Sequence, residues 1–187
     1  MKTGMIYKNV IGLIVIMSLL SCNNNDRVIN EVKELMHRKI SFPNGYEEFS
    51  CNSEYSLDNL LKQNVKVVTY MEDLSCTSCG VKTLKLWQKE IKEIDKNVAY
   101  IIVLHSDSKE QISDMTKTLS LDLPIMYYQT NIFEQKNTLE GILARNKTFL
   151  LDKENKIILV GEPFGKEKLS KLYKKTIDSL NVVYKKQ

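Results

Sequence analysis

The chain has 187 residues, a length that one domain of ordinary size can account for. Its 27 lysines and arginines and its 23 aspartates and glutamates give a formal net charge of +4. This small excess excludes the strongly basic surface by which proteins bind nucleic acids, so no nucleic-acid partner is expected.

The N-terminus has the pattern of a secretory signal peptide. Lys2 and Lys8 give a basic start, and residues 10–20 are an almost unbroken apolar run. The run is too short for a membrane-spanning helix, which needs about 20 apolar residues. It fits the apolar region of a signal peptide, which is about 7–15 residues long. We therefore expect residues 1–21 to be a signal peptide.

The apolar run ends in Leu19-Leu20-Ser21-Cys22, which resembles a bacterial lipobox. We expect Cys22 to carry lipid and to anchor the protein to a membrane of the cell envelope, facing the periplasm or the cell surface. A signal peptide with an incidental cysteine and an uncleaved anchor helix are the alternatives. Residues 22–187 keep 25 basic residues (27 less Lys2 and Lys8) and 23 acidic ones, a net charge of +2.

Apolar periodicity predicts the elements that follow. A tether and an N-terminal helix take up residues 22–39, with the helix over 27–39 and polar tether residues at 23–26. Residues 40–45 contain Pro43 and Gly45 and indicate a short strand or a turn. Further helices are expected over residues 56–63, 79–94, 109–119 and 166–180, and strands over 65–71, 98–104, 123–128, 147–151 and 156–160.

The order of these elements predicts the fold class. From residue 65 on, strands and helices alternate, which requires a mainly parallel sheet with helices on both faces. Residues 130–140 are irregular or weakly helical, and residues 152–155 form the turn of an antiparallel hairpin. We expect a three-layer α/β/α sandwich over residues 40–183.

The chemical motif is Cys76-Thr77-Ser78-Cys79, which follows a strand and opens a helix. A cysteine at a helix N-terminus is stabilised as a thiolate, the nucleophilic form. Two intervening residues bring the second sulfur within disulfide reach. Cys76 is therefore expected to attack and Cys79 to resolve. A structural disulfide and a copper site with His105 as third ligand are the alternatives.

The pattern resembles the thioredoxin superfamily, in particular exported thiol-disulfide oxidoreductases of the TlpA type and Bacteroides-group lipoproteins. The similarity covers about residues 40–183 and rests on the strands over 65–71 and 98–104, the cysteine pair and the stretch KTFLLDKENKIILVGEPF from residue 147 to 164. It implies a thioredoxin-like fold. It also implies an oxidoreductase that needs no cofactor and acts on exported proteins with thiols or disulfides.

The sequence departs from the family at three positions near the motif. Ser75 replaces the usual tryptophan before the first cysteine, and Asn146 stands where a cis-proline faces the disulfide. A cis bond before a residue other than proline costs about 2.5–4 kcal/mol, so a trans or differently shaped loop is expected there. Tyr70 replaces a buried acid. The missing tryptophan and cis-proline favour the second hypothesis, a non-catalytic scaffold or binding lipoprotein with a structural disulfide.

The remaining candidates are single residues. His105 ends a core strand at the sheet edge where such folds place their sites, although a partly exposed loop histidine is the simpler interpretation. Trp87 and Tyr100 are expected in the core. Cys51 is left without a partner and is expected to be buried.

Overall fold

The computed structural model describes residues 23–49, 56–72, 77–94 and 98–185. The chain divides into two compact units, residues 1–34 and residues 35–187. The signal peptide, Cys22, Cys51 and Cys76 lie outside the described residues, so the predictions made for them stay predictions.

The first described element is α2, which spans Asn23–Leu35, four residues earlier at each end than predicted. Asp26 lies in its first turn, where the helix dipole favours a carboxylate, so the segment expected as tether is helical instead. His37 has a left-handed backbone with φ 69°, which is incompatible with continuing the helix. Its N–H donates to the Ile157 carbonyl at 3.0 Å, so the chain turns to run along the sheet.

The sheet unit contains six strands: Glu47–Phe49 (β1), Lys66–Glu72 (β2), Ala99–His105 (β3), Ile125–Tyr128 (β4), Thr148–Leu151 (β5) and Ile157–Val160 (β6). Their order in the sheet is β1-β4-β3-β2-β5-β6. The central strands β4, β3 and β2 are parallel, while β1, β5 and β6 pair antiparallel with their neighbours. The predicted α/β class, with its parallel centre and antiparallel C-terminal hairpin, is confirmed.

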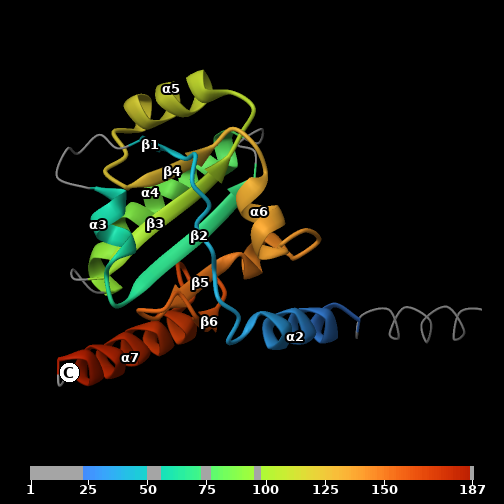
Figure 1. Cartoon of the computed structure of the whole chain (residues 1–187), viewed down its shortest axis with the longest axis vertical. Helices are drawn as coiled ribbons and strands as arrows, with labels where there is room; N and C mark the ends of the chain where they lie inside the picture. Colours follow the sequence, from blue (N-terminus) through green and yellow to red (C-terminus); the bar gives the residue numbers. More distant parts are fainter. Residues whose placement is uncertain (1–22, 50–55, 73–76, 95–97, 186–187) are drawn as a thin grey trace, which may run out of the picture. The chain divides into compact units, whose positions relative to one another are not determined.

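Helices cover both faces of this sheet (Figure 1). They are Leu57–Leu61 (α3), Thr77–Ile94 (α4), Lys109–Leu119 (α5), Ile132–Asn137 (α6) and Glu167–Tyr184 (α7), with a short 3₁₀ turn at Ala144–Asn146 (η1). Side chains of α4, α5 and α7 share one buried cluster with alternate residues of the strands. On the other face, Phe133 of α6 stacks on Tyr70 of β2 with ring centroids 5.4 Å apart.

Most element positions agree with the sequence pattern because each is set by local residues. The hairpin is an example: the Asp152 carboxylate accepts the N–H groups of Glu154 and Lys156 at 2.9 Å, and Asn155 takes the left-handed conformation with φ 64°. Strand β1 was not predicted. Its sequence, Glu-Glu-Phe, lacks the apolar alternation of a strand, and it is a strand only because it pairs with β4.

Candidate active site

The candidate site lies where the central strand β2 leads into helix α4. Strand β2 ends at Glu72, α4 begins at Thr77, and the intervening residues 73–76, including Cys76, are outside the described part of the chain. Cys79 is the third residue of α4, in its first turn. The backbone thus confirms the strand–motif–helix order on which the redox interpretation depends.

The first turn of α4 is a favourable place for a thiolate. The first four N–H groups of a helix have no partner within the helix, and the aligned peptide dipoles make this end positive. The first turn of α4 contains no acidic residue that would oppose a negative charge. Helix N-termini of this kind favour the thiolate form of a cysteine.

A cleft of about 490 Å³ opens beside this junction. Met71 and Glu72 at the end of β2 form one wall, and Thr83 and Trp87 of α4 form another. Arg145 of η1 belongs to a third side. The cleft is thus lined by Glu72 and Thr83, the described side chains before and after the stretch that contains the cysteines, and it is large enough to receive part of another molecule.

Asn146 lies in η1, at the position where the resemblance places a cis-proline. It is buried, and its N–H donates to the Leu143 carbonyl at 2.8 Å. No cis peptide bond occurs within the described segments, as expected for this loop without proline. Asn146 therefore lies in a 3₁₀ turn whose other residues, Ala144 and Arg145, line the cleft, but Asn146 is not itself a lining residue, and its role near the cysteine pair stays a prediction.

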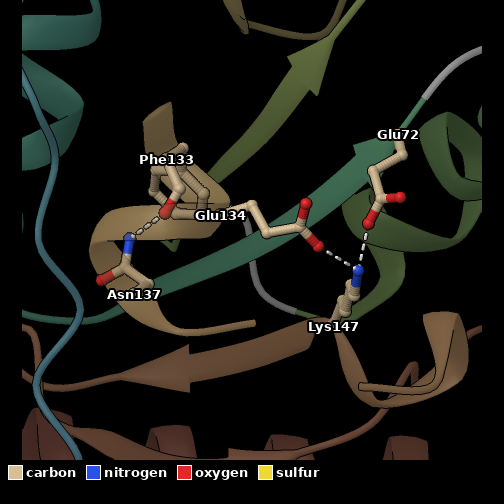
Figure 2. A network of polar contacts seen from close by, with 5 residues as sticks. All are labelled: Glu72, Phe133, Glu134, Asn137 and Lys147. Carbon is tan, nitrogen blue, oxygen red and sulfur yellow. Dashed lines mark hydrogen bonds and ion pairs between the residues drawn. The ribbon is translucent and has the colours of Figure 1, made fainter. Parts of the chain in front are cut away.

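A cluster of three charged side chains lies next to the cleft (Figure 2). The ammonium group of Lys147 lies between two carboxylates. It forms an ion pair with Glu72, and it lies 2.8 Å from the carboxylate of Glu134. Lys147 and Glu134 are almost fully buried, whereas the Glu72 side chain is 46% exposed. We call these three residues the charge cluster.

The charge cluster changes the pKa of each member. Burial would lower the pKa of Lys147, but the hydrogen bonds to both carboxylates outweigh burial and raise it. Burial also opposes the ionisation of Glu72, yet the bond from Lys147 holds the pKa of Glu72 below its usual value. For Glu134, burial and the neighbouring Glu72 raise the pKa despite the contact with Lys147. Glu134 is thus the carboxyl of the cluster that takes up a proton first on acidification.

His105 lies beside the charge cluster. It is the last residue of β3 and is directly opposite Glu72 in the parallel pairing of β2 and β3. It is half-buried, and its protonated form would favour the ionised form of Glu72. His105 therefore lies next to the end of β2, and its place near the cysteine pair stays a prediction.

Tyr70 lies six residues before the first cysteine, where the resemblance to thioredoxins leads one to expect a buried acid. It is buried, and burial raises its pKa, so its hydroxyl is neutral. Within the described part of the chain, this hydroxyl has no hydrogen-bond partner. The ammonium of Lys147 lies 5.3 Å from the centre of its ring. The site thus has an aromatic ring at this position, and the acids nearby are those of the charge cluster.

Trp87 and Tyr100 are core residues, as predicted. The indole N–H of Trp87 donates to the Glu162 carboxylate at 2.7 Å, which links α4 to the chain after β6. Sequence reasoning missed Glu134, Lys147 and Glu162. Each resembles an ordinary surface residue in the sequence, and only the fold brings it to its partner.

The described part of the chain contains neither a candidate metal cluster nor a helix that could span a membrane. No group of three His, Cys, Asp or Glu side chains within the described ranges is arranged to hold a metal ion. Because Cys76 lies outside those ranges, the copper alternative stays a prediction. None of the helices formed by the described residues has both the length and the apolar character to cross a membrane.

No model of a known protein family matches the sequence, and no curated protein matches it either. Solved structures do match. A candidate protein disulfide isomerase from Bacteroides thetaiotaomicron is 16% identical with a TM-score of 0.54, over 78% of this chain and 90% of that one. A candidate thiol:disulfide interchange protein DsbE from Chlorobium tepidum is 12% identical with a TM-score of 0.52, over 78% and 99% of the two chains.

A third structure, a thioredoxin-like protein in its oxidised form, is 11% identical with a TM-score of 0.54 and is covered over 98% of its length. At such low identity these similarities concern the arrangement of the backbone. The protein therefore has a thioredoxin-like fold, as the sequence predicted.

Proposed function

We propose that this protein is a thiol-disulfide oxidoreductase that uses Cys76 and Cys79. The observation that carries the proposal is the place of the motif: Cys79 lies in the first turn of α4, directly after the central strand β2 of a thioredoxin-like sheet. The solved structures with similar folds add support, because two of them are described as a candidate disulfide isomerase and a candidate thiol:disulfide interchange protein.

The proposed reaction needs no cofactor. The Cys76 thiolate attacks one sulfur of a substrate disulfide, and the other substrate sulfur leaves as a thiolate and takes up a proton. The Cys79 thiolate then attacks the Cys76 sulfur, so the second substrate thiol is released. Two electrons pass from the cysteine pair to the substrate. The same steps in reverse oxidise a dithiol, and the potential of the pair decides the direction.

The location of the protein is also part of the proposal. The basic start, the short apolar run and the lipobox-like end favour export and attachment through lipid on Cys22. Exported proteins with thiols or disulfides would then be the substrates. In fractionated cells, we expect the wild-type protein in the membrane fraction and a Cys22→Ala variant outside it. Equal membrane attachment of both would contradict the lipid anchor.

A trapping experiment tests the redox function. In the full chain, a Cys79→Ser variant should accumulate mixed disulfides with partner proteins on a non-reducing gel, because nothing resolves the Cys76 bond. A variant with both Cys76→Ser and Cys79→Ser is the matched control and should trap nothing. A Cys51→Ser change in both backgrounds removes the other candidate thiol within the predicted domain.

The wild-type protein and the same variants also test the two alternatives, a structural disulfide and a copper site. No trapped species, together with a reduction potential of the wild-type pair well below about −300 mV, would replace the oxidoreductase with a scaffold that has a structural disulfide. A thiolate-to-copper absorption band on titration of the reduced protein with Cu(I) or Cu(II), absent in the double variant, would instead favour a copper site.

A further inference from the structure

The end of β2 that leads to the cysteine motif has only one strand partner. β2 pairs with β3 along its whole length, from Lys66 to Glu72. On its other side the pairing with β5 stops at Thr69 and Thr148. The last three residues of β2, which form a wall of the cleft, therefore lack a neighbouring strand on that side.

Lys147 takes the place of the missing strand. Its carbonyl oxygen accepts the N–H of Tyr70 at 2.9 Å. Its ammonium group pairs with the carboxylate of Glu72, at the very end of β2. One residue thus holds this part of β2 through both its backbone and its side chain.

Lys147 is also attached to helix α6. Lys147 also pairs with Glu134 of α6 at 2.8 Å (Figure 2). Helix α6 is held in turn by Asn137, whose amide side chain accepts the Ser41 N–H at 2.7 Å and donates to the Ser41 carbonyl at 2.9 Å. Phe133 of α6 stacks on Tyr70. The charge cluster therefore joins the end of β2 to a firmly packed helix.

From this arrangement we propose that Lys147 and Glu72 are positioning residues for the cysteine pair: their contact fixes the end of β2, which directs the chain into the motif. Glu72 is four residues before Cys76, so their Cα atoms are at most about 14 Å apart. The position of the end of β2 therefore limits where the first cysteine can lie. The inference rests on the proposed redox function and adds to it the residues that set the geometry.

A pair of substitutions with opposite charge effects tests this inference. Removing the anion in Glu72→Gln favours a nearby thiolate, and removing the cation in Lys147→Gln disfavours it, so charge alone predicts opposite effects on the reactivity of the motif. Loss of positioning predicts the same effect in both variants. The readout is the rate at which the reduced full chain reacts with 5,5′-dithiobis(2-nitrobenzoic acid), measured against pH in a Cys51→Ser background.

We expect both variants to react about tenfold more slowly than the wild type across the pH range, because misplaced reacting groups lose rate without a change of chemistry. The double variant should lose no more than either single variant, since both break one contact. Lys147→Arg keeps the charge and the donors and should restore the rate. Lys109→Gln and Glu47→Gln, which break an exposed ion pair elsewhere on the sheet, serve as matched controls and should react like the wild type.

The outcomes separate the two proposals. Near-ultraviolet circular dichroism shows whether Lys147→Gln folds. If it does not, the rate of Glu72→Gln alone decides the test. This variant is expected to fold, because the Glu72 side chain is half exposed and Lys147 still has its ion pair with Glu134. Opposite shifts, or rates equal to the wild type, would overturn the positioning role and leave the redox function standing. A wild-type pair that forms no reversible disulfide would overturn the redox function and this inference with it.

Discussion

The N–H of Tyr70 donates to the carbonyl of Lys147 at 2.9 Å, one residue beyond the last register pair of β2 and β5. At this point the two chain segments separate, and the residues on both sides line the cleft at the end of β2. Because no strand fills it, side chains decide its shape. Lys147 and Glu72 form part of its lining, and both belong to the charge cluster.

The buried hydroxyl of Tyr70 yields a first prediction. It has no hydrogen-bond partner among the residues that the structure describes, and an unsatisfied buried hydroxyl costs about 1–3 kcal/mol. Tyr70→Phe should therefore raise the free energy of unfolding by about 1 kcal/mol, measured by urea denaturation. Tyr173→Phe is the contrasting variant, because the Tyr173 hydroxyl donates to the Gly161 carbonyl at 2.7 Å. A loss of stability in Tyr70→Phe would show that its hydroxyl is in fact bonded.

Tyr173 also predicts how stability depends on pH. Burial raises the pKa of Tyr173 far above its usual value of about 10. A raised folded-state pKa contributes stability that is fully present below the unfolded pKa and is lost as the pH rises above it. At pH 8 the free energy of unfolding of the wild type should exceed that of Tyr173→Phe by about 1–2 kcal/mol. At pH 11 this gap should be smaller by about 1.4 kcal/mol, and a gap independent of pH would contradict the assignment.

The link between α4 and the chain after β6 can be tested through Glu162. Its carboxylate accepts the Trp87 indole N–H at 2.7 Å, and a bond to a charged group is worth about 1.5–3 kcal/mol. Glu162→Ala should lower the free energy of unfolding by about 2 kcal/mol, whereas Glu162→Gln, which keeps an acceptor, should lose less. Glu167→Ala is the control, because its pair with Lys171 is exposed and should matter little. Equal losses in all three would refute a specific role for the indole bond.

Three buried hydroxyls lie between the sheet and α4. Thr69 Oγ1 is 2.9 Å from Tyr100 Oη and 3.1 Å from Thr148 Oγ1. Thr69→Val keeps the shape but removes the shared partner, and the expected loss is about 2 kcal/mol by thermal or urea unfolding. Thr176→Val, whose exposed hydroxyl bonds only to the Leu172 carbonyl of its own helix, should change stability by less than about 0.5 kcal/mol. A Thr69→Val protein as stable as the Thr176→Val protein would contradict this assignment.

The sequence by itself determined the order of the elements and the fold class. Apolar strands such as residues 98–104, the Asp152 turn and the amphipathic helix after Cys79 are local patterns, and local residues decide them. The motif was found for the same reason, since its chemistry depends on a spacing of three residues and on a strand before it.

Tertiary structure alone decided what surrounds the motif. Lys147 meets Glu72 across 75 residues of sequence, and β1 becomes a strand only by pairing with β4. The periodicity of the sequence does not predict which distant residue a charged side chain will pair with. Its burial is decided only by the packing of the sheet against α6. The thioredoxin-like fold was therefore predictable from the chain, whereas the charge cluster beside its cleft was not.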